Sequence, residues 1–392
     1  MKRILTAVFA ICLLLSSDVF ACTSAIFTGK ATPDGRPLMW KHRDTGEPNN
    51  RIQYFKGEKY TFYALINSPD FFNNEAWTGT NEVGFSIMNT ASYNLKDDDV
   101  PSKMMDKEGV VMFKALATCR TLADFEKMLD KYKRPMGVEA NFGVIDAEGG
   151  AAYYEVNNDS WSKVDVNDPK IAPQGYLVYT NHSNTGRLND GMGYVRYTNA
   201  DKIVKEQINR NGAITPQWIM QNLSRTFYHS VLGIDLNKDK ELVDKCNGWF
   251  FDQDFIPRKS STCSIVVEGV KKGEKPSNTV MWTILGYPPV GVAVPLMVSN
   301  GDNVPAFMTA KETANAKMCD WVLEKKKEIF PIKRGNGNKY LNYYAIEKYM
   351  KPAVEIENKV FEMANPIVEK IRKGEATSAD LEAVYKEVEK IF

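Results

Sequence analysis

The sequence predicts an α+β fold that carries a helical extension at its C-terminal end. Two observations predict this arrangement. Short apolar runs typical of strands recur between residues 23 and 298, with helical patterns between them. After about Met308 the pattern becomes charged and helical. The hydrophobic content of 43% is ample for a packed core and excludes a disordered chain.

The elements of the expected body follow one another in mixed order. Helical patterns cover 110–117 and 122–132, where Pro135 ends the second, and later 199–211 and 216–227. The expected strands are the runs 23–28, 37–41, 61–66, 84–89, 142–146, 151–156, 176–180, 264–267, 280–285 and 291–298. Strands interspersed with helices predict a body in which both pack on a common core.

The expected extension consists of the helical segments 311–330, 340–373 and 378–392, with a Gly/Asn-rich linker at 334–338. Glu and Lys alternate there, a pattern typical of a solvated helix face. We therefore expect packing or assembly rather than chemistry, and the helices are a candidate surface for homo-oligomer formation. The expected division is a signal peptide at 1–21, a catalytic body at 22–308 and the extension at 309–392.

The charge balance excludes one class of function. The chain has 50 Lys+Arg against 49 Asp+Glu, a formal charge of +1. A protein that binds nucleic acid through bulk basicity carries a clear positive excess, so no nucleic-acid partner is expected. No internal apolar run approaches the roughly 20 residues that span a bilayer.

The first 21 residues have the pattern of a Sec signal peptide. A positive start at Met1-Lys2-Arg3 precedes an apolar stretch at 4–15, and Val19-Phe20-Ala21 fits a small-x-small cleavage site. The alternative is an apolar N-terminal core helix. The signal interpretation predicts export to the periplasm or the medium of a bacterial cell, with a mature chain that starts at Cys22.

Cysteine usage gives no sign of a metal site. With Cys12 in the signal segment, the expected mature chain keeps Cys22, Cys119, Cys246, Cys263 and Cys319. They are widely scattered, with no CxxC and no histidine at metal-ligand spacing, so neither zinc nor another cofactor is expected. An odd number leaves at least one thiol outside any intramolecular disulfide. Two disulfides and buried free thiols both remain open.

Cleavage after Ala21 would give Cys22 a thiol and a free α-amine on the same residue. An α-amine has an ordinary pKa of about 7.7–8.0, so a sizeable fraction is neutral near neutral pH. It can accept the thiol proton, directly or through a water, without any histidine. Cys22 is therefore the candidate nucleophile, and its own amine is the candidate base.

Cationic and acidic residues are expected opposite this cysteine. The runs 22–28 and 36–44 flank the turn Pro33-Asp34-Gly35, and pairing about that turn places residues whose numbers sum to about 65 face to face. Cys22 then lies opposite Arg43 and within a residue of Asp44. The Asp44 carboxylate could hold the amine, and the cations could lower the thiol pKa or hold an anionic substrate. The alternative is an ordinary edge hairpin with a charged end.

Several motifs resemble the cysteine N-terminal-nucleophile (Ntn) hydrolases. Cys22-Thr23-Ser24, a hairpin and then Lys41-x-x-Asp44 are similar to the opening of choloylglycine hydrolases, penicillin V acylases, acid ceramidase and the acyltransferase-like enzymes that act on penicillin nuclei. Residues 79–85 are similar to the family's GxNExGL segment. Residues 141–146 with 154–156, and then Tyr179-Thr180-Asn181, follow in the family's order.

The resemblance implies a four-layer αββα sandwich that cleaves linear, non-peptide C–N amides through an acyl-thioester. It implies that Cys22 is nucleophile and base, that Asp44 orients the amine, and that Asn89 and Asn181 stabilise the oxyanion. The substrate would be a small N-acyl amide, and the acyl group would pass to water or to another amine. No cofactor or metal is implied.

Two departures from the family concern substrate binding. Bile-salt hydrolases carry Arg where this chain has Lys41, and Arg43 is expected to share its task. A late arginine of the family falls at Ile265, and the nearest cation is Arg258. We therefore expect Lys41, Arg43 and Arg258 to bind substrate.

Two rival interpretations use a cysteine differently. A papain-like pair would need His182 or His229 beside a cysteine, but the sequence around no mature cysteine fits that family. In the other, Cys22 is the lipid-modified residue of a surface binding protein, although Val19 and Phe20 fit a lipobox poorly. Acylation would block the amine, so this alternative and the amidase exclude each other.

Overall fold

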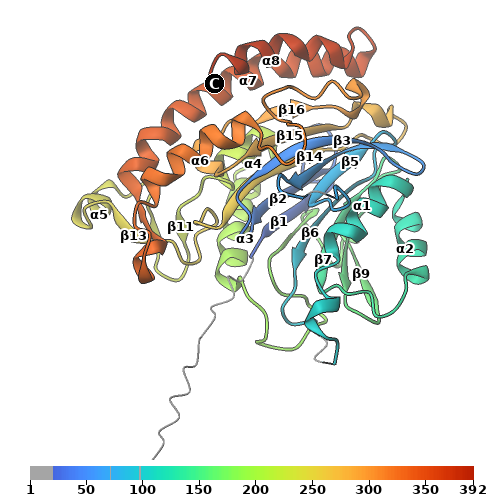
Figure 1. Cartoon of the computed structure of the whole chain (residues 1–392), viewed down its shortest axis with the longest axis horizontal. Coiled ribbons are helices and arrows are strands. Elements are labelled where there is room, and N and C mark those ends of the chain that lie inside the picture. The colour runs from blue at the N-terminus through green and yellow to red at the C-terminus, as the bar shows by residue number, and fades with distance from the viewer. Residues whose placement is uncertain (1–20, 71, 97–98) are drawn as a thin grey trace, which may run out of the picture.

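The computed structural model describes residues 21–70, 72–96 and 99–392. Residues 1–20, which hold most of the expected signal peptide, lie outside the described residues. The described chain is built around two large antiparallel sheets that lie face to face (Figure 1). None of the described helices combines the length and apolar character needed to cross a membrane.

The first sheet has six strands in the order β10-β1-β2-β14-β15-β16, and each neighbour is antiparallel. It places β1 and β2 near its middle, because later segments pair on both sides of the N-terminal hairpin. Its strands are β1 (Thr23–Phe27), β2 (Leu38–Asp44), β10 (Tyr176–Tyr179), β14 (Ser261–Glu268), β15 (Val280–Leu285) and β16 (Val294–Leu296).

The second sheet is a seven-stranded antiparallel meander in chain order. Its strands are β3 (Asn50–Lys56), β4 (Thr61–Asn67), β5 (Thr78–Asn81), β6 (Ser86–Ala91), β7 (Ala140–Ile145), β8 (Ala151–Val156) and β9 (Trp161–Asp165). It contacts the first sheet through the pairs β1 with β6 and β2 with β7. Ser24 and Tyr153 share a hydrogen bond of 3.1 Å between the sheets, and the Tyr153 and Tyr179 rings stack at 4.1 Å.

Helices α1 (Glu108–Thr118) and α2 (Leu122–Lys131) cover the outer face of the second sheet. A capping box between Thr121 and Asp124 starts α2, and Phe125 packs edge-on against Phe142 and Tyr154.

The helices on the outer face of the first sheet are α3 (Tyr194–Asn209), α4 (Pro216–Asn222), α6 (Lys317–Ile329) and α7 (Tyr343–Lys373). The four-layer αββα arrangement and the C-terminal helices are therefore confirmed. The predicted helix 216–227 ends earlier in the structure, at Asn222. The regular hydrogen-bond pattern stops there, because the N–H groups of Leu223 and Ser224 both donate to Ile219 O.

The C-terminal helices share the core of the body. The Phe361 ring of α7 stacks on Trp282 of β15 at 4.2 Å, and Tyr385 of α8 (Glu382–Glu389) donates 2.9 Å to Pro295 O. Figure 1 shows α7 and α8 running over the β15–β16 end of the first sheet. The extension therefore packs on the sheet along most of its length.

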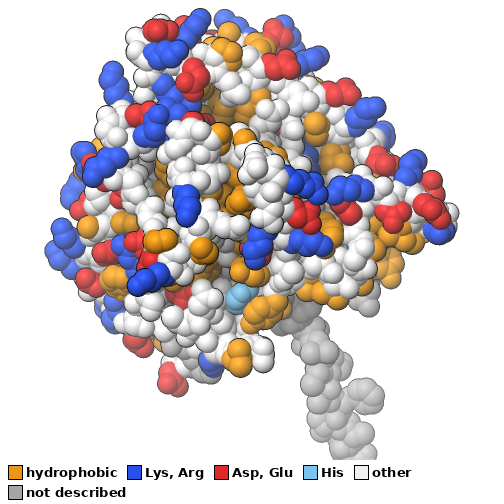
Figure 2. All heavy atoms as spheres, turned by 180° about the vertical axis from the view of Figure 1, so that it is seen from behind, with side chains coloured by type: hydrophobic (Ala, Val, Ile, Leu, Met, Phe, Trp, Pro, Cys, Tyr) orange, Lys and Arg blue, Asp and Glu red, His pale blue; other side chains and the backbone are white. Residues whose placement is uncertain are grey.

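Smaller elements complete the chain between α4 and α7. They are β11 (Tyr228–His229), β12 (Ile234–Asp235), α5 (Lys240–Lys245), β13 (Trp249–Phe251) and β17 (Tyr340–Asn342). Strand β17 of the extension pairs with β13 of the body. The five cysteines Cys22, Cys119, Cys246, Cys263 and Cys319 are all free thiols. On the face seen in Figure 2, basic and acidic side chains are interspersed.

Candidate active site

The N-terminal hairpin has the register that the sequence predicts. Thr23 pairs with His42 and Ser24 with Lys41, so each pair sums to 65. Continued by one residue, this register places Cys22 opposite Arg43. Side chains alternate between faces along a strand. Cys22, Lys41 and Arg43 therefore share the face toward the second sheet.

The Cys22 sulfur is buried at the end of β1. Only 7% of the residue is exposed, and Sγ lies 3.8 Å from Asp44 O. The Cys22 carbonyl accepts 2.6 Å from Arg196 Nη1, and the preceding Ala21 carbonyl accepts 2.5 Å from Arg258 Nη2. The backbone on both sides of the Ala21–Cys22 bond is thus held by arginines.

Lys41 binds protein groups from the facing sheet. Its Nζ donates 2.6 Å to Asn89 Oδ1 and 2.5 Å to Trp77 O. Burial lowers the pKa of Lys41 to about 8, while the neighbouring Cys22 thiol acts in the opposite direction. Because Lys41 holds the amide oxygen of Asn89, Nδ2 points elsewhere, and no described residue accepts from it. Asn89 thus presents a side-chain donor.

Arg43 lies on the same face as the Cys22 sulfur. Its Nη2 donates 2.8 Å to Asn67 Oδ1, and its guanidinium lies 4.8 Å from the centre of the Trp77 ring. Its Nη1 is buried and has no partner among the described residues. Burial lowers the pKa of Arg43, and the nearby Cys263 and Cys22 thiols oppose that effect.

Asp44 lies on the other face of β2 and binds two partners. Its Oδ1 accepts 2.5 Å from Ser261 Oγ, and its Oδ2 is in a short contact with the Arg258 guanidinium. Arg258 therefore bridges the Asp44 carboxylate and the Ala21 carbonyl. Sequence analysis predicts that Asp44 orients the amine and that Arg258 binds substrate. In the structure the two side chains form an ion pair with each other. Ser261 was not foreseen.

Arg196 of α3 connects the cysteine to Asn181. Besides the Cys22 carbonyl, it donates 2.9 Å to Thr23 Oγ1 and 2.7 Å to Asn181 Oδ1. The amide nitrogen of Asn181 donates 2.8 Å to Ala91 O at the end of β6. Burial and the Arg258 charge lower the pKa of Arg196 to about 9. No motif marks Arg196 in the sequence, because its role depends on where α3 begins.

The three histidines have other partners. His42 lies 2.9 Å from Ser261 Oγ, and burial lowers its pKa to about 4, so it is neutral near pH 7. His182 hydrogen bonds Thr180 and packs on Tyr194. His229 accepts from the Leu232 N–H. None is hydrogen bonded to a cysteine within residues 21–70, 72–96 and 99–392, which does not fit the papain-like alternative.

A cavity of about 800 Å³ lies beside the Ala21–Cys22 bond. It is lined by Ala21, Arg196 and Arg258, and by Lys326 and Phe330 at the end of α6. Ala21 is only 4% exposed and forms part of the cavity wall.

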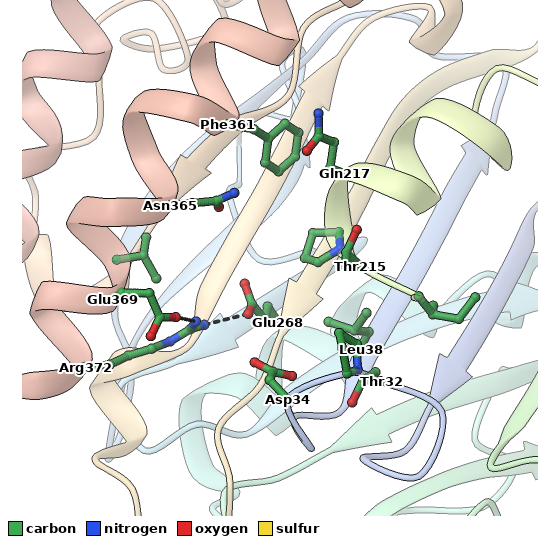
Figure 3. A pocket seen from close by; sticks show the side chains of 14 residues that line it. Thr32, Asp34, Leu38, Thr215, Gln217, Glu268, Phe361, Asn365, Glu369 and Arg372 are labelled. Carbon is green, nitrogen blue, oxygen red and sulfur yellow. Dashed lines mark hydrogen bonds and ion pairs between the residues drawn. The ribbon is translucent and has the colours of Figure 1, made fainter. Parts of the chain in front are cut away.

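A second, smaller pocket of about 310 Å³ lies between the hairpin turn, the start of α4 and α7 (Figure 3). Its charged groups satisfy one another: Arg372 pairs with Glu268 and Glu369, each at 2.6 Å. Asp34 of the turn lines it, and this turn is at the end of the hairpin away from Cys22. The pocket therefore has no contact with the cysteine chemistry.

Comparisons with known proteins give similarities in fold only. No family model matches the chain, and no curated protein matches its sequence. A Caenorhabditis elegans ortholog of N-acylethanolamine-hydrolyzing acid amidase is 14% identical over 63% of this chain and 92% of its own, with a TM-score of 0.42. A conjugated bile acid hydrolase from Clostridium perfringens is 12% identical over 71% and 93%, also at 0.42.

A penicillin V acylase from Agrobacterium tumefaciens is 12% identical over 72% of this chain and 87% of its own, with a TM-score of 0.38. Bile acid hydrolase and penicillin V acylase are enzyme types that the N-terminal motifs resemble. These TM-scores lie below 0.5, so the similarities assign no role to individual residues of this chain.

Proposed function

We propose that this chain is an exported amidase that cleaves linear, non-peptide C–N amides through an acyl-thioester on Cys22. The observation that carries the proposal is the position of the Cys22 sulfur. It lies at the end of β1, on one face with two cations, and the backbone on either side is fixed by Arg196 and Arg258. A reactive cysteine needs such an electropositive, well-positioned environment.

Release of Ala21 would create the base. The new amine would form where Arg258 now holds the Ala21 carbonyl, beside the Asp44 carboxylate. A guanidinium close to an ammonium group lowers the ammonium pKa and favours the neutral amine, while a carboxylate can orient it. The pair Asp44–Arg258 would thus hold an amine that accepts the thiol proton.

In the first step the thiolate attacks the amide carbon. The C–S bond forms, negative charge develops on the carbonyl oxygen, and the C–N bond breaks as the proton passes from the amine to the leaving nitrogen. Asn89, through its side-chain N–H groups, and Asn181, oriented by Arg196 and Ala91, would stabilise the oxyanion. Each donor is worth about 2.7–4 kcal/mol of barrier in comparable sites.

In the second step the α-amine takes a proton from water as the water oxygen attacks the thioester carbon; the C–S bond then breaks, the acid leaves and the proton passes from the amine to the Cys22 sulfur. An amine that attacks in place of water would instead receive the acyl group. Both outcomes use the same residues, so hydrolase and acyltransferase activities are variants of one proposal.

Burial of the sulfur argues against the lipoprotein alternative. A diacylglyceryl group on Sγ must reach a membrane, but Cys22 is 7% exposed and its side chain points between the two sheets. The strand end would have to leave the sandwich before a diacylglyceryl group on the thiol could insert into a membrane.

The experiment is the intact mass of the chain recovered from an exporting host, followed by activity on a panel of N-acyl amides. We expect a chain that starts at unmodified Cys22 and loses activity when iodoacetamide alkylates it. Cys22→Ala should lack activity and keep its circular dichroism spectrum, and Cys263→Ala is the matched control for a buried thiol on the same sheet. A lipid mass on Cys22, a start elsewhere or full activity of Cys22→Ala would refute the proposal.

A further inference from the structure

The first turns of the C-terminal extension are packed closely against the body. Val322 of α6 lies over Gly286, where a Cβ would come within 2.7 Å of the Val322 Cβ. Gly286 also has a φ of +78°, which only glycine adopts readily. One turn earlier, Cys319 lies 3.4 Å from Pro48 O. This close approach directs the following turns of α6 toward the cavity beside Ala21.

Lys326 connects the extension to Ser261, the residue whose hydroxyl binds Asp44. Its Nζ donates 2.9 Å to Ser261 O, and the hydroxyl of Ser261 donates 2.5 Å to Asp44 Oδ1. The Tyr287 ring lies 5.4 Å from Nζ. No carboxylate in the described part of the chain forms a salt bridge with Lys326. The Asp44 and Asp252 charges act on the Lys326 ammonium, but both carboxylates are bound by other partners. A half-buried ammonium that lines a cavity without a salt bridge of its own favours a negative group in that cavity.

Most charged residues in the lining of this cavity are basic. It contains the basic residues Arg196, Arg258, Lys259, Lys326, Lys327 and Lys339. The acidic residues of the described lining are Asp252 and Asp254. Asp252 is buried, and its carboxylate accepts a hydrogen bond of 2.7 Å from the Lys259 backbone N–H. This carboxylate is therefore already bound to the protein. Three of the cations, Lys326, Lys327 and Lys339, come from the extension.

We propose that the C-terminal extension completes the substrate site and makes it selective for amides that carry an anionic group, with Lys326 as a specificity-determining residue. This inference rests on the proposed amidase function. The anionic group is a carboxylate, sulfonate or phosphate on the acyl or the amine part, and it enters the cavity beside Ala21. The extension is thus part of the catalytic unit.

The test compares two probes that differ only in charge, N-decanoylglycine and N-decanoylethanolamine, on the full exported chain. For Lys326→Met we expect kcat/KM on the glycine probe to fall about tenfold or more through KM, with the ethanolamine probe within about twofold. Lys326→Arg should retain the preference. Lys317→Met, at the exposed start of α6 and outside the cavity, is the matched control and should change neither probe.

Binding to Cys22→Ala separates this inference from the proposed function. Calorimetry should show tighter binding of the glycine probe, and Lys326→Met in that background should remove the difference. If the wild-type chain cleaves neither probe but this binding preference is present, the amidase proposal fails and the anion-selective cavity stands. An equal loss on both probes, or no Lys326-dependent preference in turnover and binding, overturns the inference and leaves Lys326 as a support for Ser261.

Discussion

At the scale of single residues, two arginines hold the backbone that carries the Cys22 sulfur, the proposed nucleophile. Arg258 binds the Ala21 carbonyl and Arg196 binds the Cys22 carbonyl, at 2.5 and 2.6 Å. Rotation of the strand end would break one of these charge-assisted bonds, so the sulfur is positioned before any substrate arrives. In the proposed mature chain, which lacks Ala21, Arg196 would still bind the Cys22 carbonyl, and Arg258 would contact Asp44 and the new amine.

The oxyanion role of Asn181 can be separated from its contact with Arg196. Asn181→Ala should lower kcat by about 100- to 1000-fold, with a smaller change in KM, because the donor acts mainly in the transition state. Asn181→Asp keeps an oxygen for Arg196 but lacks the N–H donor, so it should be impaired to a similar degree. Steady-state kinetics would contradict the oxyanion role if Asn181→Asp retained activity or if only KM changed.

His42 gives the fold a defined sensitivity to acid. Burial lowers its pKa to about 4, whereas the unfolded chain has a value near 6.5, so the unfolded state binds more protons between these pH values. The contribution of neutral His42 to the free energy of unfolding is fully present above pH 6.5 and is lost as the pH falls toward 4. It amounts to about 3 kcal/mol at most.

The corresponding variant is His42→Gln, which keeps a polar group for Ser261 and cannot titrate. In urea unfolding at a series of pH values, we expect the wild-type chain to lose more stability than this variant between pH 6.5 and 4. Parallel curves for the two proteins would contradict the assigned titration.

At the scale of elements, the loop before α3 depends on one glycine. Gly193 precedes α3 with a φ of +78°, and a Cβ there would lie 2.3 Å from the Arg196 guanidinium. Gly193→Ala should cost about 1–3 kcal/mol of stability and displace Arg196 from the Cys22 carbonyl, with a loss of kcat. Gly233→Ala is the control: its φ is +66°, but nothing lies within 4 Å of the added Cβ. Equal kcat in both variants would contradict this role.

Much of the fold and part of the site follow from the sequence, and the remainder has a physical reason. The hairpin register was predictable because the Pro33-Asp34-Gly35 turn fixes which residues face each other. Strand β3 was missed because Arg51, Gln53 and Lys56 interrupt its apolar pattern, although Arg51 is buried by contacts with distant backbone carbonyls.

The site shows the same division. Cys22, Lys41, Arg43 and Asp44 lie on one hairpin, so local spacing places them together. Arg196 and Ser261, and the contact between Arg258 and Asp44, arise where α3 and β14 meet that hairpin. Sequence spacing carries no information about such contacts, because they depend on how distant elements pack. The motif that resembles the Ntn hydrolases identified Asn181 but not the arginine that orients it.

At the scale of the whole molecule, the extension and the body share a buried ion pair. Glu357 of α7 binds Arg225 through both oxygens, at 2.8 and 2.7 Å, and also accepts 2.9 Å from the Ala293 N–H. Both side chains are almost completely buried. A buried pair adds little net stability over apolar residues, but loss of one partner leaves an uncompensated charge.

Glu357→Gln should therefore destabilise the protein by about 3–5 kcal/mol, because Arg225 keeps its charge in a dry environment. The double variant Arg225→Met with Glu357→Met should recover most of that loss, since neither charge remains to be desolvated. Because Phe361 of the same helix stacks on Trp282 of the first sheet, tryptophan fluorescence and far-UV circular dichroism should report one shared unfolding transition. Two separate transitions, or a cost below about 1 kcal/mol for Glu357→Gln, would mean that the extension folds independently of the sheet that carries Cys22.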